Sequence, residues 1–336
     1  MVAKYLCIII FALIAASCSE ETPKKIPRFA KDPEKVSEIA PISKNSFRPQ
    51  LDILFVIDDS GSMSTHQTNL SQNINKFADA IVRTKFLDYH VGVITSTSLG
   101  SSWSSKPCCG ALAGTPRYVD RATPNGIQVL ASNLIVGTSG DAVEKFFDPV
   151  YLAFTEPNLS GHNVGFYRQS ASLALIFITD TEDQSKMFTA QSINSFLLTL
   201  KGSAEKLFVA AAHIPDSEIK TCSGETSDIQ NKSGLTDFFQ LTQATTFSLC
   251  DNFGDKLADI GAKIANQAQT MYLSQVPVKG TIKITMDGAE LPSDAKYGWT
   301  YNASNNSIEF GAGIDWDSYP DGVYPQVNFE VIEMKP

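Results

Sequence analysis

Several features that mark common classes of protein are missing from this sequence of 336 residues. Its six cysteines include no CxxC pair, which argues against a zinc site or a thioredoxin-like redox motif. It has only four histidines, and none of them lies in a recognisable catalytic motif. Neither GxSxG nor HExxH occurs. An enzyme is therefore the function that the sequence favours least.

Positive charge and long apolar segments are also scarce. The formal net charge is -9 and the pI is about 5.0, so the chain lacks the electrostatic footprint of a protein that binds nucleic acid. Beyond the N-terminus, no stretch is long and apolar enough to span a bilayer. Because 43% of its residues are hydrophobic, the chain can still bury a sizeable core, in one large domain or two.

The N-terminal segment has the layout of a secretory signal. Lys4 precedes a short apolar run, and small residues follow it. The run closes in IAASCSE, which resembles the lipobox of bacterial lipoproteins; the alternative is an ordinary cleavage site followed by an unrelated cysteine. The resemblance implies that residues 1–17 are removed and that Cys18 carries lipid. It also implies a location in the cell envelope, at the outer membrane because Ser19 is not Asp.

Residues 18–49 are predicted to form a flexible tether. They mix charges of both signs with several prolines and few large apolar residues. Such a segment cannot bury enough surface to fold alone. It would hold the folded part of the chain off a membrane.

Residues 50–273 alternate between strand and helix patterns. Apolar runs typical of strands occupy residues 51–57, 89–97, 171–180, 205–214 and 245–250. Apolar residues at helical spacing occupy residues 67–86, 141–154, 189–200, 234–245 and 253–273, with a kink expected at Pro149. Strands that are apolar on both faces are typical of a parallel sheet covered by helices on each side. The expected fold class is α/β, with a doubly wound, mostly parallel sheet.

Residues 274–336 are expected to form a small all-β module. Their short strand patterns are separated by Asp-Gly, Asn-Asn and Pro-Asp-Gly turn signals, and no helix is indicated. The module is rich in aromatic residues, which we interpret as its core rather than as a stacking platform for sugar. These residues are Trp299, Tyr301, Trp316, Tyr319 and Tyr324.

In the stretch LFVIDDSGSM, an apolar strand ends abruptly in side chains that carry oxygen. The spacing Asp58-x-Ser60-x-Ser62 turns three oxygens toward one point, in a tight loop that Gly61 is expected to make possible. Asp180 ends another apolar strand, and open α/β sheets bind ligands beyond the carboxyl ends of their strands. Carboxylates and hydroxyls without nitrogen or sulfur suit Mg²⁺, Mn²⁺ or Ca²⁺.

These segments resemble those of von Willebrand factor A domains, which build a metal-ion-dependent adhesion site. FVIDDSGSM resembles the DxSxS segment of the family, and IFITDTEDQS resembles the strand that bears its distal aspartate. LIVGTSGDAVEKF offers Thr138 as the loop threonine of the family, with Ser139 as its substitute. The resemblance covers roughly residues 50–272. The alternative interpretation is that Asp59 or Ser60 only caps the following helix.

The resemblance implies a function in binding. Ser60, Ser62 and Thr138 would be the direct or near-direct ligands, and Asp58 and Asp180 would often act through water. Neutral hydroxyls would leave the cation short of negative charge, so a carboxylate of a protein or other macromolecular partner would complete its coordination. The implied protein is a lipid-anchored, non-enzymatic adhesion protein of the envelope. The alternative is a structural or scaffolding lipoprotein in which the metal only stabilises the loops.

Three further side chains near these motifs need an interpretation. Glu182 and Asp183 directly follow Asp180 and could form an acid/base pair, but a solvated acidic rim is the favoured interpretation. His66 lies close to the DxSxS loop and is expected to be a solvent-facing residue of the first helix.

Besides Cys7 in the signal and Cys18 at the lipidation point, four cysteines remain, and an even number indicates disulfides in an exported protein. Cys222 and Cys250 are the favoured pair, because both are expected on loops at the edge of the sheet. Cys108 and Cys109 would then remain as a vicinal pair, within a long insertion at residues 97–118. Four cysteines allow three pairings, so the connectivity stays open.

Overall fold

The computed structural model describes residues 45–46, 48–82, 87–97, 109–141, 143–214, 234–251, 253–311, 313–320 and 322–331. The chain divides into two compact units, residues 1–39 and 40–336, and the first lies wholly outside the described ranges. The predicted signal, Cys18 and most of the predicted tether therefore fall outside them too. Within the described ranges, no helix is long and apolar enough to cross a membrane.

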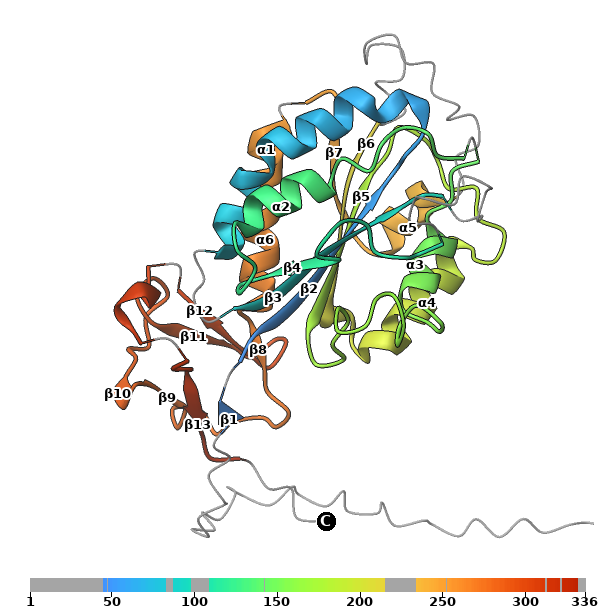
Figure 1. The fold of residues 1–336 in the computed structure, drawn as a ribbon. Helices are drawn as coiled ribbons and strands as arrows, with labels where there is room; N and C mark the ends of the chain where they lie inside the picture. The colour runs from blue at the N-terminus through green and yellow to red at the C-terminus, as the bar shows by residue number, and fades with distance from the viewer. Residues whose placement is uncertain are drawn as a thin grey trace, which may run out of the picture. The chain divides into compact units, whose positions relative to one another are not determined.

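A six-stranded sheet forms the centre of the α/β part, in the order β4-β3-β2-β5-β6-β7 (Figure 1). Its strands are β2 (Gln50–Ile57), β3 (Asp88–Thr95), β4 (Tyr118–Asp120), β5 (Ser172–Ile178), β6 (Leu207–His213) and β7 (Thr245–Ser248). Neighbouring strands run parallel except β4, which is antiparallel to β3. The predicted fold class, α/β with a mostly parallel sheet, is confirmed.

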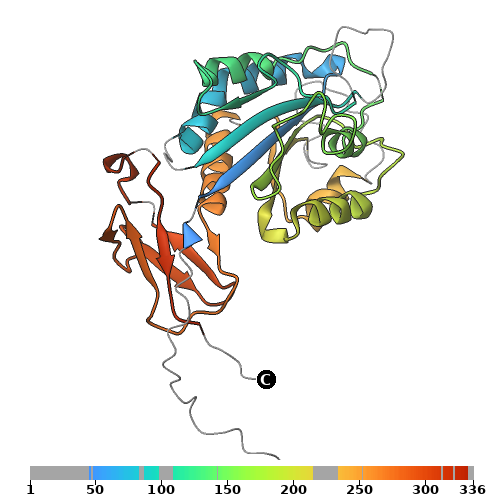
Figure 2. The same ribbon diagram turned by 60° about the horizontal axis from the view of Figure 1, so that its bottom comes forward.

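Helices cover both faces of this sheet, as Figure 1 and Figure 2 show. One face carries α1 (Ser64–Val82), α2 (Gly126–Asn133) and α6 (Phe253–Ala268), and the other carries α3 (Phe147–Ala153), α4 (Ala190–Lys201) and α5 (Leu235–Leu241). Phe55 of β2 packs edge-on against Phe77 of α1, with 5.4 Å between ring centroids. On the opposite face, Phe177 of β5 lies 5.8 Å from Phe238 of α5. The central strands β2 and β5 are mostly apolar because each of their faces meets a helix layer.

Two helices differ from the predicted pattern. Helix α3 begins at Phe147, so Pro149 lies in its first turn, where a missing N–H removes no intrahelical hydrogen bond. Because no helical turn precedes Pro149, the proline does not kink α3. Helix α2 was not expected, because only Leu130 among its residues is fully buried and no wide apolar stripe marks it.

The β module consists of two antiparallel sheets, ordered β1-β13-β9-β10 and β11-β12-β8. Their strands are β1 (Asn45–Ser46), β8 (Met271–Tyr272), β9 (Lys283–Met286), β10 (Ala289–Glu290), β11 (Trp299–Asn302), β12 (Ser307–Phe310) and β13 (Gln326–Asn328). Trp299 is 7% exposed, and its indole N–H donates to the carbonyl of Leu291 at 3.0 Å. Tyr301, Trp316 and Tyr319 pack against the same core, as interpreted from the sequence.

Strand β1 lies in the segment that was predicted to be tether. Asn45 pairs with Val327 and Ser46 with Gln326, both in β13 near the end of the chain. The module is therefore built from residues on both sides of the α/β part. A pairing between residues so far apart in the sequence leaves no local pattern, which is why composition alone suggests a tether there.

Candidate metal centre

The candidate site lies beyond the carboxyl ends of the neighbouring strands β2 and β5. Ile57 pairs with Ile178 at the end of the two strands, and the Asp58 N–H donates to the carbonyl of Ile178 at 3.0 Å. This parallel register places Asp58 at the same edge of the sheet as Asp180. Both side chains are buried, with exposed fractions of 0% for Asp58 and 5% for Asp180.

The Asp58 carboxylate is held by neutral donors. Its Oδ1 accepts from the Ser60 N–H at 2.9 Å, and its Oδ2 accepts from the Thr179 hydroxyl at 2.8 Å. Burial raises the pKa of Asp58 to about 6, with the charge of Asp180 adding to the rise and the Ser60 and Thr179 hydrogen bonds opposing it. Two neighbouring carboxylates thus share one buried edge. That arrangement favours a cation near them.

Ser60 and Ser62 present their hydroxyls at the surface side of this loop. Ser60 is half-buried, Ser62 is exposed, and their Oγ atoms lie 3.2 Å apart. Gly61 between them does not have a left-handed backbone, and a Cβ there would meet nothing within 4 Å. The expectation that the loop needs a glycine at this position is therefore wrong. Any small residue would fit.

The loop that carries Thr138 and Ser139 is joined to the Asp58 loop on both sides. On one side, the Gln67 amide of α1 donates from Nε2 to the carbonyls of Asp58 and Gly137, both at 2.9 Å. On the other side, the Gly140 N–H donates to the carbonyl of Asp59 at 2.8 Å. Thr138 is half-buried and Ser139 is exposed.

The Asp59 side chain is bound to the loop that follows β3. It is 3% exposed, and its Oδ1 accepts from the hydroxyls of Ser96 and Thr97, each at 2.9 Å. Ser60, at the start of the 3-10 turn Gly61–Met63, makes no side-chain capping bond. A Cβ at Gly140 would lie 2.4 Å from the Asp59 carboxylate, so only glycine lets the loop approach this closely.

Asp141 lies in the loop that follows Thr138 and Ser139. The Asp141 N–H donates to the Thr97 hydroxyl at 3.2 Å. Its Oδ2 is buried and accepts no hydrogen bond from any residue that the structure describes. A buried carboxylate oxygen without a donor is costly.

The donor set fits a hard cation better than a soft one. In the described ranges, no group of three or more His, Cys, Asp or Glu side chains could hold a metal ion. A cation at the strand tips would depend on hydroxyls together with Asp58 and Asp180. These are oxygen ligands, which Mg²⁺, Mn²⁺ and Ca²⁺ prefer.

Glu182 and Asp183 are not the solvated rim that the sequence suggested. Glu182 is 9% exposed and accepts from the Thr236 hydroxyl and, at 3.3 Å, from its N–H at the start of α5. Asp183 accepts from the N–H groups of Phe146 and Phe147, at 2.7 and 3.2 Å, at the start of α3. Both carboxylates therefore satisfy N–H groups that helix starts leave without intrahelical partners. They also fix the loop that begins at Asp180.

His66 is not solvent-facing, because only 6% of it is exposed. Helix α1 begins at Ser64, earlier than the apolar spacing indicated, so His66 joins the buried stripe of Leu70 and Ile74. Gln67, which joins the two loops, lies beside it and is 2% exposed. Nothing in the sequence marks Gln67, since its partners belong to other segments.

The cysteine pairing remains a prediction. Cys108 and Cys222 lie outside the described residues. Cys250, which follows β7, is disulfide-bonded. The Cys109 N–H donates to the carbonyl of Thr97 at 2.9 Å, which places Cys109 beside the β3 loop.

No protein-family model and no curated protein matches this chain. Its fold is similar to that of a von Willebrand factor type A protein from Catenulispora acidiphila, at 13% identity and a TM-score of 0.39, over 85% of this chain and 59% of that one. It is also similar to proximal thread matrix protein 1 from the mussel byssus, described with a zinc-occupied MIDAS motif, at 13% identity and a TM-score of 0.41, over 68% and 50%. A third similar structure is the pilus adhesin SpaC from Lactobacillus rhamnosus GG, at 9% identity and a TM-score of 0.41, over 85% and 39%.

This chain thus spans between 39% and 59% of the length of those solved chains. At such identities and TM-scores, the similarities carry no argument about the site. The case for a metal centre rests on the geometry of the strand tips.

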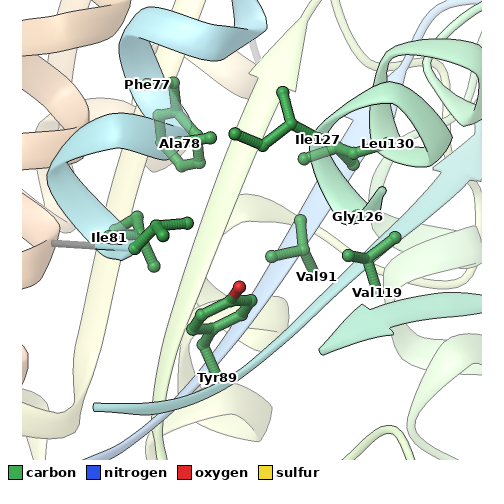
Figure 3. A pocket seen from close by; sticks show the side chains of 10 residues that line it. Phe77, Ala78, Ile81, Tyr89, Val91, Val119, Gly126, Ile127 and Leu130 are labelled. Atoms are coloured by element: carbon green, nitrogen blue, oxygen red, sulfur yellow. The ribbon is translucent and has the colours of Figure 1, made fainter. Parts of the chain in front are cut away.

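A small hollow elsewhere in the α/β part does not compete with the strand tips. Figure 3 shows it between α1, α2, β3 and β4, walled by apolar side chains that include Phe77, Ile81, Val91 and Leu130. Its volume is about 20 Å³, enough for about one water molecule. It is too small for an organic ligand.

Proposed function

We propose that the α/β part of this protein binds a divalent cation at the strand tips. Mg²⁺ is the preferred ion, with Mn²⁺ or Ca²⁺ as alternatives. Asp58, Ser60, Ser62, Thr138 and Asp180 would hold it. The observation that carries the proposal is the layering of the site, with two buried carboxylates behind hydroxyls that reach the surface.

We further propose that the site binds a macromolecular partner through a carboxylate of that partner. A bound cation would supply a coordination position that a carboxylate oxygen can fill. Because Ser62 and Ser139 are exposed, the hydroxyl side of the site is open to a partner. Because Asp58 and Asp180 are buried, the protein's own negative charge lies behind that opening rather than across it.

The alternative is a scaffolding protein in which the cation only stiffens the loops. The hydrogen bonds of Gln67 and of the Asp59 carbonyl already join the Asp58 and Thr138 loops. A cation is therefore not needed as the sole link between these loops. This favours binding over scaffolding.

A hydrolytic role has less support than either of these. Glu182 and Asp183 are the acidic side chains nearest to Asp180 in sequence, and both already accept hydrogen bonds from helix starts. A general base must instead reach a water or substrate proton. We therefore propose that the protein is not an enzyme.

We propose a lipid anchor at Cys18 and a tether that together hold this protein in the cell envelope, at the outer membrane. The support is the sequence of the N-terminal segment, which has the layout of a lipoprotein signal. Replacing Cys18 with Ala should move the protein from the membrane fraction to the soluble fraction. If the variant stays membrane-bound in the same proportion, the anchor lies elsewhere.

Calorimetric titration of Mg²⁺ into the purified mature chain tests the cation site directly. We expect saturable binding that is lost in Asp58→Ala while the circular dichroism spectrum is kept. Undiminished affinity in Asp58→Ala would rule out this ligand set. Capture of envelope proteins in Mg²⁺ but not in chelator would then separate partner binding from scaffolding.

A further inference from the structure

We propose that Gln67 is a positioning residue that fixes Thr138 relative to Asp58. The inference rests on the proposed cation site and names a residue that acts on it without being one of its ligands. Gln67 lies in the first turns of α1 and is 2% exposed. It touches the two loops whose separation decides whether their oxygens can reach one ion.

All of the useful hydrogen-bonding capacity of this amide is committed to the two loops. Its Nε2 donates to the Asp58 carbonyl and to the Gly137 carbonyl, both at 2.9 Å. Its Oε1 accepts from the Gly137 N–H at 3.1 Å. Glutamate lacks the two donors, methionine has no donor and only a weakly accepting sulfur, and asparagine is one methylene shorter. Only glutamine makes this set of bonds from its place on the helix.

The Gly137 contact matters because Thr138 is the next residue. Gly137 has a positive φ of 88°, a backbone conformation that only glycine adopts without strain, so the chain turns sharply just before Thr138. Three residues after Gly137, the Gly140 N–H is held by the Asp59 carbonyl at 2.8 Å. Thr138 and Ser139 therefore lie in a short loop segment that is held at both ends, at Gly137 and at Gly140.

Loss of the Gln67 hydrogen bonds would free the Gly137 end of that loop segment. The carbonyls of Asp58 and Gly137 and the Gly137 N–H would lose a buried partner, and the loop would move to reach water. The other end would stay bound to Asp59. Thr138 would then shift relative to Ser60 and Ser62. Removing such an outer partner of a metal ligand typically weakens metal binding about 10- to 100-fold.

The test compares Gln67→Met with a matched glutamine in the same chain. Gln267 of α6 also donates from Nε2 to two backbone carbonyls, those of Glu205 at 2.8 Å and Leu207 at 3.4 Å. Mg²⁺ affinity is measured by calorimetry in the mature chain, together with the melting temperature. We expect Gln67→Met to bind Mg²⁺ about 10- to 100-fold more weakly, and Gln267→Met to bind it normally, although both lose hydrogen bonds.

A double-mutant cycle with Thr138→Ala separates positioning from general destabilisation. If Gln67 acts through Thr138, then Gln67→Met has little further effect on affinity once Thr138 is Ala. If the two losses simply add, Gln67 does not act through Thr138 and the inference is overturned. It is also overturned if Gln67→Met binds as tightly as the wild type. Should Gln67→Met not fold, Gln67→Glu, which keeps the acceptor for the Gly137 N–H, takes its place in the same cycle.

The outcomes also distinguish this inference from the proposed function. A wild-type chain that does not bind Mg²⁺ or Mn²⁺ contradicts the cation site itself. A wild-type chain that binds, with Gln67→Met unchanged, leaves the cation site standing and contradicts only the role of Gln67.

Discussion

Each end of strand β2 carries a buried carboxylate, but the two carboxylates have different kinds of partner. At the amino end, Asp52 is 0% exposed and faces Arg168, whose Nη2 lies 2.8 Å from Asp52 Oδ1. The backbone N–H of Arg168 also donates to Asp52, at 2.7 Å. At the carboxyl end, Asp58 is equally buried, but its partners are the Ser60 N–H and the Thr179 hydroxyl. Within the described residues, Asp58 forms no ion pair.

This difference distinguishes a charge that belongs to the fold from one that is available to a ligand. Burial raises the pKa of Asp52, and the neighbouring Arg168 guanidinium opposes that rise by neutralising the carboxylate. At Asp58 the nearby charge is that of Asp180, which raises the pKa further. The amino end of β2 is therefore complete without a ligand. At the carboxyl end, no cation among the described residues pairs with Asp58.

The largest expected effect comes from removing the cation at the amino end. Arg168→Met leaves Asp52 buried without its guanidinium partner, so the free energy of unfolding should fall by about 3–5 kcal/mol. Urea unfolding at pH 7 measures it. Lys76→Met is the control, because the Lys76–Asp255 pair is exposed and should contribute about 0–1 kcal/mol. Equal losses in the two variants would contradict the comparison.

Neutralising the carboxylate at the other end should have the opposite effect on stability. Burial raises the pKa of Asp58 to about 6. Ionising Asp58 at pH 7 therefore costs more free energy in the folded chain than in the unfolded chain. In the absence of metal, Asp58→Asn should therefore keep or raise the free energy of unfolding, while Mg²⁺ binding is lost. Urea unfolding and calorimetry on the same sample measure both. A destabilisation as large as that of Arg168→Met would show that Asp58 is structural.

Adding negative charge at the strand tips should sharpen the distinction between adhesion and stiffening. Ser62→Asp supplies an internal carboxylate, which should keep or strengthen Mg²⁺ binding. It should weaken partner binding about tenfold or more, because like charges brought together at an interface cost several kcal/mol. Asp180→Ala should weaken both. Full partner affinity in Ser62→Asp, with metal present, would contradict the adhesion mechanism.

The smallest effect is a pH dependence near the amino end of the sheet. Lys201 Nζ donates to the carbonyl of Arg168 at 2.9 Å, and burial lowers the pKa of this lysine to about 8. Between pH 8 and the ordinary lysine value of 10.5, the folded chain therefore binds fewer protons at Lys201 than the unfolded chain. Its contribution to stability should rise with pH in that window.

Urea unfolding of the wild type and of Lys201→Met, at pH 7 and at pH 9.5, isolates this contribution. The wild type should gain relative to the variant by about 1 kcal/mol, since one unit of pKa shift corresponds to about 1.4 kcal/mol. A gain by the variant with rising pH would contradict the assigned direction.

The central strands, and the common edge at which Asp58 and Asp180 lie, are the parts of the structure that the sequence predicts best. LDILFVI and LALIFI are apolar at every position except Asp52, so burial on both faces and a central place in a parallel sheet follow from composition. Asp58 and Asp180 end those strands, so their common edge follows from the parallel order. These inferences need only local pattern and the rules of sheet topology.

The parts that escaped prediction depend on partners far away in the chain. Gln67 and Gly137 are 70 residues apart, and their hydrogen bonds leave no periodicity. The sequence around Asp183 predicts a surface carboxylate, because nothing local shows that the start of α3 donates hydrogen bonds to it. His66 is buried because α1 begins at Ser64, earlier than the apolar spacing predicts, and a helix boundary shifts which face a residue occupies. In each case the chemistry of the residue is visible in the sequence, while its neighbour is not.

The pairing of β1 with β13 has a consequence for biosynthesis. Asn45 and Ser46 leave the ribosome before any part of the six-stranded sheet, whereas Gln326 and Val327, which pair with them, follow all of that sheet. All of the α/β part is therefore available before β13, and the four-stranded sheet can close only once β13 has been made. Since β13 lies between β1 and β9, a chain that stops before Gln326 would leave β1 with no strand to join, and the edge of β9 would be bare.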